Sequence, residues 1–170
     1  ALLCGHSYGG LVAVGAAALL PGLEKLVLYE PPMGGVLAAQ SWTEGYERQL
    51  EAGQRATAVR AFLREVGGYS QAEIAQMQET PAWAKRLAVA PTVPRELRAE
   101  RDLALESLEL GSLGARCLML LGSESPAWAK RSTDAYAGAL ADVRVHELEG
   151  HGHGGTVSAP DWVARELIRA

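Results

Sequence analysis

The chain has 170 residues, of which 48% are hydrophobic and 21% charged, and its formal net charge is −4. This length suits one compact domain or part of a larger one, and the mild negative charge gives no basic surplus for binding nucleic acid. No apolar stretch reaches the roughly 18–20 residues of a membrane span without glycine, proline or charge, so we expect no membrane partner either.

The first segment alternates between apolar and glycine-rich sequence. An apolar run at residues 1–4 is followed by GHSYGG at residues 5–10, and a second apolar run extends to Leu20, where a Pro-Gly pair stops it. This pattern predicts a strand, a tight turn and a helix. Because the helix carries almost no polar residues, we expect it to be buried on all sides and to pack closely through residues 15–18.

The middle of the chain is predicted to be helical. Residues 25–29 form another strand-like run, but residues 36–113 show no strand signal. Glycines and prolines divide this stretch into five expected helices, at 43–51, 54–66, 71–78, 81–90 and 94–105. Its larger apolar side chains are candidates for the lining of a substrate pocket, but their helical spacing is more typical of a helical core than of ligand contacts; they are Trp42, Tyr46, Phe62, Tyr69, Met77 and Trp83.

The last part of the chain returns to alternating elements. Strands are expected at 116–121 and 143–148. Between them, Ser125 is the expected N-cap of a helix that has Pro126 at its first position and ends near Ala141. A final helix is expected at about 159–168.

The order of these elements predicts the fold class. Strands that alternate with helices indicate an α/β fold with a parallel sheet and flanking helices, into which an all-helical cap is inserted. The chain then divides into an α/β part at 1–35, the helical cap at 36–113 and a second α/β part at 114–170.

The glycine-rich turn has the spacing G-x-S-x-G, read from Gly5, Ser7 and Gly9. A serine on a sharp turn between strand and helix exposes its hydroxyl, and the helix start directs the amide of Tyr8 toward a developing oxyanion. One alternative is a turn that merely packs a helix on a strand. Another is a phosphate-binding loop, which the missing Lys-Ser/Thr ending and the missing third glycine of a dinucleotide site disfavour.

The expected strand at the start of the chain, followed by the sequence GHSYGG, resembles the nucleophile elbow of the α/β-hydrolase superfamily. The element order is similar to the second half of that fold, with residues 36–113 in the place of its cap. The resemblance implies that the first half of such a domain is missing here, together with one of the two donors to the oxyanion. We therefore expect this chain alone to have little or no activity.

The resemblance also implies a base in the loop EGHGHGG. The family pattern G-x-G-H selects His153, and His151 is the fallback. His6 occupies an elbow position that is commonly a structural histidine, and His146 is expected to pack or to lie at the surface. A metal site at the His-Gly-His sequence is the alternative, but no cysteine or carboxylate ligand is nearby.

Two glutamates compete for the role of the acid that holds the base. Relatives usually carry an aspartate three residues after the glycine of RCLMLLG, where this chain has Ser125, and the nearest carboxylate is Glu124. Glu30 follows the strand next to the elbow strand, where some relatives place their acid, and it is followed by two prolines. We favour Glu30, with Glu124 as the alternative.

The two cysteines, Cys4 and Cys117, lie in strand-like runs. If the strands follow the family order, one strand separates them, so their backbones are about 9–10 Å apart. That distance exceeds the roughly 7 Å limit for a disulfide. We expect two buried, reduced thiols and a cytoplasmic protein.

These residues together predict a serine hydrolase that acts on a small, apolar ester or lactone by Ser-His-acid catalysis with Ser7, His153 and Glu30. We expect no cofactor and no metal, and a small-molecule substrate as the partner. The same skeleton also serves C–C bond hydrolases and cofactor-free haloperoxidases, and a third reading is a hydrolase-like module that binds a ligand without catalysis.

Overall fold

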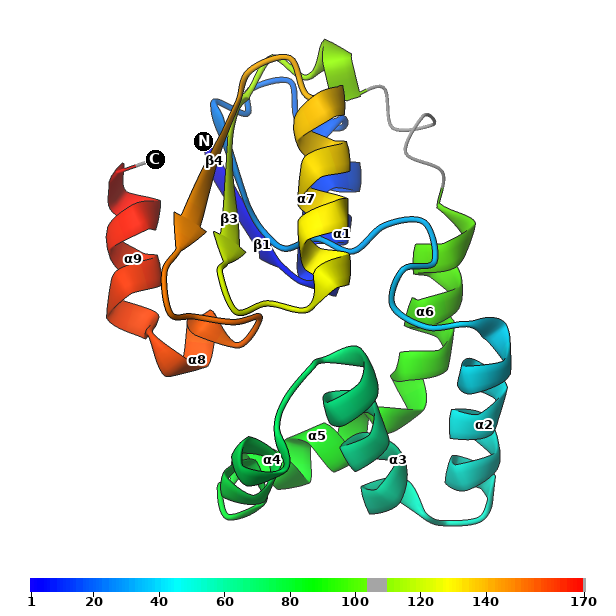
Figure 1. Cartoon of the computed structure of the whole chain (residues 1–170). Coiled ribbons are helices and arrows are strands. Elements are labelled where there is room, and N and C mark those ends of the chain that lie inside the picture. The colour runs from blue at the N-terminus through cyan, green and yellow to red at the C-terminus, as the bar shows by residue number, and fades with distance from the viewer. Residues whose placement is uncertain (104–109, 170) are drawn as a thin grey trace.

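The computed structural model describes residues 1–103 and 110–169, and its centre is a parallel four-stranded sheet (Figure 1). The strands are β1 (Leu2–His6), β2 (Lys25–Tyr29), β3 (Arg116–Gly122) and β4 (Val143–Leu148), and they lie in the order β1-β2-β3-β4. Helices lie on both faces of the sheet, so the predicted α/β class is confirmed.

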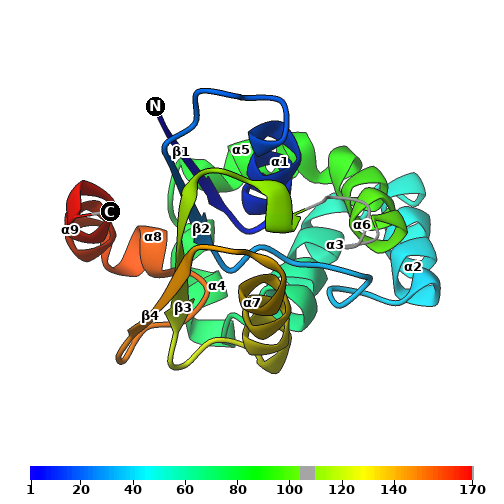
Figure 2. The same cartoon turned by 90° about the horizontal axis from the view of Figure 1, so that it is seen from above.

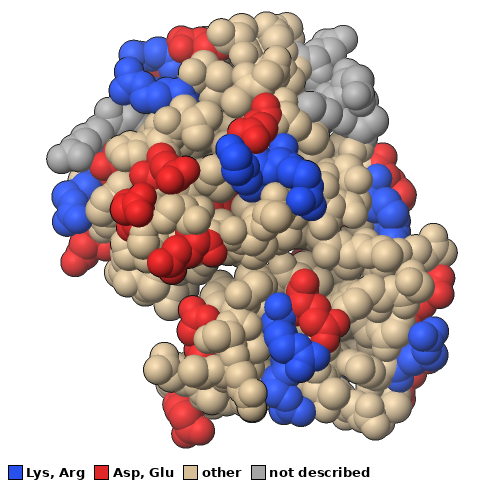
Figure 3. Space-filling model, in the orientation of Figure 1, with Lys and Arg blue, Asp and Glu red and all other residues tan. Residues whose placement is uncertain are grey.

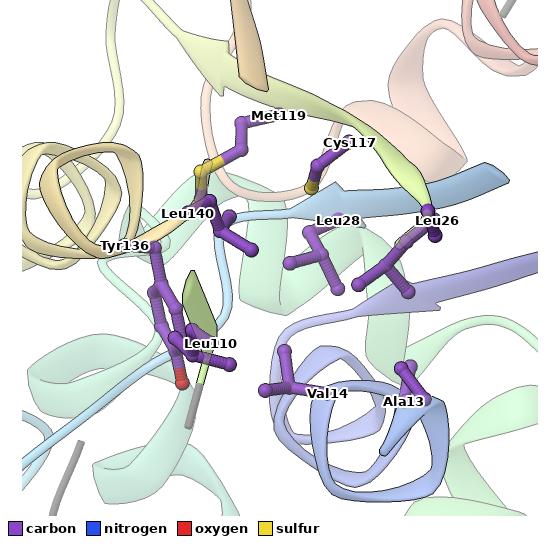
Figure 4. Close-up of a cluster of buried hydrophobic side chains, with 11 residues drawn as sticks. Ala13, Val14, Leu26, Leu28, Leu110, Cys117, Met119, Tyr136 and Leu140 are labelled. Carbon is purple, nitrogen blue, oxygen red and sulfur yellow. The ribbon is translucent and has the colours of Figure 1, made fainter. Parts of the chain in front are cut away.

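Alternate side chains of β2 face opposite layers, as a strand's period of two requires. Leu26 and Leu28 are buried against α1 (Tyr8–Ala17) and α7 (Ala127–Ala139), in the cluster shown in Figure 4. Val27 and Tyr29 are buried on the other face, in a cluster that includes Val163 of α9 (Pro160–Arg169). Figure 2 shows α9 on the opposite side of the sheet from α1 and α7.

Helix α1 is less buried than its sequence predicts. Leu11 and Val14 are buried, but Val12 is 56% exposed and Leu19, beyond the end of the helix, is 80% exposed. A Cβ on Gly15 would meet no heavy atom within 4 Å, so this part of the helix is not closely packed. The reason is that α1 lies over β1, an edge strand of the four-stranded sheet, and therefore packs along one side only.

A helical segment at residues 40–102 connects β2 to the second half of the sheet, below its carboxyl edge in Figure 1. The expected helices at 43–51, 71–78 and 81–90 are present within three residues at each end. Residues 54–66 form two elements, because the α-helix changes to a π-helical turn at Phe62. The elements are α2 (Gln40–Glu51), α3 (Arg55–Ala61), η1 (Phe62–Val66), α4 (Gln71–Gln78), α5 (Ala82–Val89), η2 (Ala90–Thr92) and α6 (Val93–Asp102).

The segment has a small core of its own. Val59, Leu63, Ile74 and Ala90 form a buried cluster, against which Leu50, Leu87 and three of the predicted core side chains (Tyr69, Met77 and Trp83) pack. The other three aromatic side chains, Trp42, Tyr46 and Phe62, contact one another. The end of the expected helix at 94–105 falls partly outside the described residues; α6 ends at Asp102. A short η4 helix (Leu110–Ser112) precedes β3.

Glu100 ties the connection after β2 to α6. Its Oε1 accepts hydrogen bonds from the backbone N–H groups of Gly35 (2.8 Å) and Val36 (3.1 Å). The side chain is fully buried, and this burial raises its pKa. A buried carboxylate near the end of the helical segment therefore binds the backbone that leads from β2 to the start of the segment.

Cys4 and Cys117 lie on β1 and β3 with β2 between them, and both are free thiols. Cys117 is buried, but Cys4 is exposed, so the expectation of two buried thiols is wrong for Cys4. Cys4 pairs with Val27 and faces the layer of α9, whose cluster covers β2, β3 and β4 but not β1.

Among the residues that the structure describes, no helix is both long and apolar enough to traverse a lipid bilayer.

Candidate active site

Four polar side chains follow the four strands at the same edge of the sheet. Ser7 comes directly after β1, Glu30 directly after β2, Ser125 three residues after β3 and His153 in the loop after β4. Because parallel strands present their carboxyl ends at one edge, these side chains converge there, facing the helical segment (Figure 1).

The turn at Ser7 is sharp and strained. Ser7 and Glu30 are the only non-glycine residues with positive φ in the described part of the chain, at 55° and 45°. A Cβ on Gly5 would lie 2.4 Å from the carbonyl oxygen of Gly9, so position 5 accepts no side chain. Gly9 itself has free space around it, whereas a Cβ on Gly10 would approach Pro31 to 3.0 Å. The backbone is therefore crowded at Gly5 and Gly10 but not at Gly9.

A continuous hydrogen-bond chain links the serine to a buried carboxylate. Ser7 Oγ lies 3.0 Å from His153 Nε2, and His153 Nδ1 lies 2.5 Å from Glu30 Oε2. The exposed fraction is 0% for Glu30 and 8% for His153. With Nδ1–H donating to the carboxylate, Nε2 is free to accept the serine hydroxyl proton.

The second oxygen of Glu30 is held by the turn after β3. Glu30 Oε1 accepts the backbone N–H of Gly122 at 2.7 Å and the hydroxyl of Ser125 at 2.5 Å. The carboxylate therefore has three donors, which fix its rotamer.

The structure corrects the role expected for Ser125. Pro126, not Ser125, is the N-cap of α7, and no side chain caps the helix. The Ser125 hydroxyl donates to Glu30 instead, because the turn after β3 places it opposite the end of β2. A Ser-Pro pair before a helix favours a cap in the sequence, and no local signal indicates the carboxylate on the neighbouring strand.

The two alternative site residues lie apart from the chain of hydrogen bonds. Glu124 is exposed, and its only hydrogen bond among the described residues is made by its backbone N–H to the carbonyl of His151. The ring of His151 makes no hydrogen bond to any described residue. The structure therefore brings together Ser7, His153 and Glu30.

The loop that carries His153 is held by two ring side chains. Tyr29 donates its hydroxyl to the carbonyl of Gly152 at 2.6 Å, and His6 Nε2 lies 2.8 Å from the carbonyl of His153. Burial, together with the charge of His153, lowers the pKa of His6 to about 4, so His6 is a neutral donor. Burial and the charge of Glu30 raise the pKa of Tyr29. The structural role expected for His6 matches this geometry.

Close packing completes the placement of the loop. A Cβ on Gly155 would lie 2.3 Å from the Tyr29 hydroxyl oxygen, at the start of a short helix, α8 (Gly155–Ser158), that the sequence pattern did not predict. The indole of Trp128 packs edge-on against the His153 ring, with 4.9 Å between the ring centroids. Its Nε1–H donates to the carbonyl oxygen of Val66 at 3.2 Å. Trp128 therefore connects the His153 loop to the helical segment.

The remaining histidine and the backbone donor also have defined places. His146 Nδ1 lies 3.1 Å from Glu166 Oε2, and its ring packs on Trp162, away from the site.

Tyr8 is the first residue of α1, so its N–H has no acceptor one turn earlier in the helix. Among the described residues nothing else accepts from this N–H, which leaves it free for an oxygen placed beside Ser7.

A cavity of about 160 Å³ lies over Ser7, between the sheet and the helical segment. Its walls include Phe62 and Tyr69, two of the apolar side chains that the sequence offers as pocket lining or as helical core. The lining of this cavity also includes residues that no pattern in the sequence placed at the site: Leu37, Leu63, Val66, Arg86 and Trp128. Three of the lining residues belong to the π-helical turn, a feature that is frequent at functional sites.

A larger groove adjoins the same histidine. It has a volume of about 650 Å³, and its lining includes His153, Tyr69, Gly154 and Val157. The space-filling view shows a hollow between the sheet-bearing part and the helices below it, with acidic and basic side chains scattered on both sides (Figure 3). Within residues 1–103 and 110–169, no group of three or more His, Cys, Asp or Glu side chains could hold a metal ion.

Comparison with known proteins agrees with this architecture. The model of the Alpha/beta hydrolase family matches residues 1–166. No curated protein matches the sequence significantly. An alpha/beta hydrolase from Sphaerobacter thermophilus DSM 20745 is similar in structure with a TM-score of 0.76 and 26% identity, over 99% of this chain and 66% of that chain.

Two further solved structures share the fold. A hydrolase from Pseudomonas aeruginosa PA01 gives a TM-score of 0.73 and 20% identity, over 100% of this chain and 65% of that chain. An esterase from Exiguobacterium antarcticum gives a TM-score of 0.68 and 18% identity, over 99% of this chain and 65% of that chain. The chain thus spans somewhat less than two thirds of the length of each of these structures. With its parallel sheet, its elbow at Ser7 and a family match over residues 1–166, the chain belongs to the alpha/beta hydrolase family.

Proposed function

We propose that this chain carries the catalytic residues of a serine hydrolase that cleaves the ester bond of a small ester or lactone. The observation that supports this most strongly is the chain of two hydrogen bonds, 3.0 Å from Ser7 Oγ to His153 Nε2 and 2.5 Å from His153 Nδ1 to Glu30 Oε2. Ser7 is the nucleophile, His153 the base and Glu30 the acid in this proposal.

The proposed reaction follows from the direction of these bonds. His153 Nε2 takes the hydroxyl proton as Ser7 Oγ attacks the carbonyl carbon, and the Tyr8 N–H donates to the oxyanion that forms. His153 then gives the proton to the leaving oxygen, and the acyl group stays on Ser7. Water then attacks the acyl carbon while His153 takes its proton, the bond from that carbon to Ser7 Oγ breaks, and His153 returns the proton to Oγ as the acid leaves. Glu30 orients the ring and stabilises its positive charge throughout.

The substrate is proposed to be small because the cavity over Ser7 is about 160 Å³, and the apolar walls of Phe62, Leu63 and Val66 suit a short carbon chain. We also propose that the helical segment acts as a cap, since it supplies these walls. The predicted division at residues 35 and 113 and the cytoplasmic location stay predictions.

Labelling with a fluorophosphonate probe tests the proposal. We expect a covalent adduct at Ser7, identified by peptide mass spectrometry, because the probe reacts only with an activated hydroxyl. The Ser7→Ala variant should lose the adduct, and Ser41→Ala, which changes an exposed serine on α2, should keep it. A folded protein that gives no adduct at Ser7 would instead support a module that binds a ligand without catalysis.

A further inference from the structure

A positively charged side chain lies in the wall of the cavity that contains Ser7. Arg86 comes from α5 and lines this cavity together with Ser7 and His153. It also lines a second cavity of about 500 Å³, and Phe62 and Leu63 are shared by the two cavities in the same way. Arg86 therefore stands where the two spaces meet.

One donor of the Arg86 guanidinium group, Nε, has no acceptor within the part of the chain that the structure describes. This nitrogen atom is buried. None of the ion pairs between the described residues includes Arg86. An arginine remains charged at physiological pH, and a buried donor without an acceptor is unfavourable. A ligand that brings an anionic acceptor to this point would satisfy it.

The charge of Arg86 acts within the cavity. Burial raises the pKa of the Tyr69 hydroxyl, and the positive charge of Arg86 opposes that rise. Tyr69 lines both the small cavity and the larger groove beside His153. The buried carboxylate of the site, Glu30, accepts from His153, Gly122 and Ser125, and among the described residues it forms no ion pair with Arg86.

Two spaces adjoin His153, and Ser7 lines only the smaller of them. The leaving group receives its proton from His153 and can extend from that ring into the groove of about 650 Å³, which neither Ser7 nor Arg86 lines. The acyl part stays attached to Ser7 and shares the small cavity with Arg86. An anionic group that reaches Arg86 therefore belongs to the acyl part.

We propose that Arg86 binds a carboxylate on the acyl part of the substrate, so that the preferred substrates are hemi-esters of short dicarboxylic acids. This inference rests on the proposed function. The planar guanidinium fits a carboxylate through two parallel hydrogen bonds, and the apolar walls of Phe62 and Leu63 fit the methylene chain between the two carbonyl groups. The proposed substrate differs from the expected small, apolar ester or lactone in one respect, its charged end.

Hydrolysis of matched esters tests the inference in the intact protein. The substrates are the monoethyl esters of malonic, succinic, glutaric and adipic acid, with ethyl pentanoate as the neutral reference. We expect kcat/KM for the best hemi-ester to exceed that for ethyl pentanoate by about 10- to 100-fold, the range of a charge-assisted hydrogen bond. In Arg86→Met this ratio should fall to about one, and Arg86→Lys should restore part of it.

Lys85→Met is the matched control, because Lys85 is the exposed neighbour on α5 and lines neither cavity. The ratio should be unchanged in this variant. A ratio near one in the unaltered protein, or a high ratio that survives Arg86→Met, would overturn the inference.

A binding measurement separates this inference from the proposed function. Glutarate binding is measured by calorimetry in the Ser7→Ala variant, with and without Arg86→Met. Loss of binding on removal of Arg86 supports the anion site even if the fluorophosphonate probe fails to label Ser7. Equal binding with and without Arg86 refutes the site even if Ser7 is labelled.

Discussion

Replacement of Glu30 by glutamine is the sharpest test of the hydrogen-bond chain. The carboxylate accepts from three donors: His153 Nδ1 at 2.5 Å, Gly122 N–H at 2.7 Å and the Ser125 hydroxyl at 2.5 Å. A glutamine side chain has only one acceptor oxygen, so its NH₂ group must face a donor in either orientation.

Both orientations impair the base. If the NH₂ group faces His153, the ring must accept at Nδ1 and carry its proton on Nε2, where it cannot accept the proton of Ser7. If the NH₂ group faces Gly122 and Ser125, a buried donor is left unsatisfied, at a cost of about 1–3 kcal/mol, and the imidazolium loses its counter-charge. We expect kcat to fall by about 10³- to 10⁴-fold, which corresponds to about 4–5.5 kcal/mol of activation free energy.

The assay is ester hydrolysis by the intact protein at pH 7–8, with circular dichroism to verify that Glu30→Gln is folded. Glu124→Gln is the control, and it should change kcat less than about twofold because the Glu124 carboxylate is exposed and makes no hydrogen bond to the described residues. A folded Glu30→Gln variant with more than a tenth of the original kcat would refute the reasoning, as would a large loss in Glu124→Gln.

Two further predictions concern stability. Gly5→Ala places a methyl group 2.4 Å from the backbone oxygen of Gly9, so it should destabilise the protein by about 3 kcal/mol or more, or prevent folding. Gly9→Ala meets open space inside a helix and should be neutral or stabilising by about 0.5–1 kcal/mol; urea denaturation compares the two, and similar losses would contradict the packing argument. The pKa of His6 is about 4 when folded and 6.5 in a free chain, so the unfolded state takes up the proton first. The stability contributed by neutral His6 is complete above pH 6.5 and declines as the pH falls toward 4, by about 3 kcal/mol in all. His6→Gln should flatten that part of the stability–pH curve, and an unchanged slope would show that another group is responsible.

The fold was largely predictable because its strands are short, apolar and separated by clear breaks. The strands at 25–29 and 143–148 have the predicted bounds. Residues 26–29 form a continuous apolar run because β2 is buried on both faces, whereas β4 is an edge strand in which only Leu148 is buried. The burial of α1 was overestimated, because composition does not reveal that the helix lies over an edge strand.

The site was predictable only where a residue lies in a local pattern. Ser7 and His153 stand in glycine-rich motifs, and the structure places them 3.0 Å apart. Glu30 and Glu124 could not be separated locally, because the choice depends on which strand end faces the loop after β4. Ser125 was missed for the same reason, because its partner Glu30 follows another strand. Arg86 was missed because it reaches the cavity that contains Ser7 from a distant helix, and no spacing along the chain indicates that position.

The distance along the sequence between Ser7 and His153 has a consequence for assembly. These two side chains are 146 residues apart, and Glu30 is 123 residues from His153. Contacts of such long range require the chain to close its largest loop, and they are entropically the most expensive to form. The reactivity proposed for Ser7 therefore depends on nearly the whole chain being in place, and we expect a labelled serine to appear during refolding only at the last stage of folding.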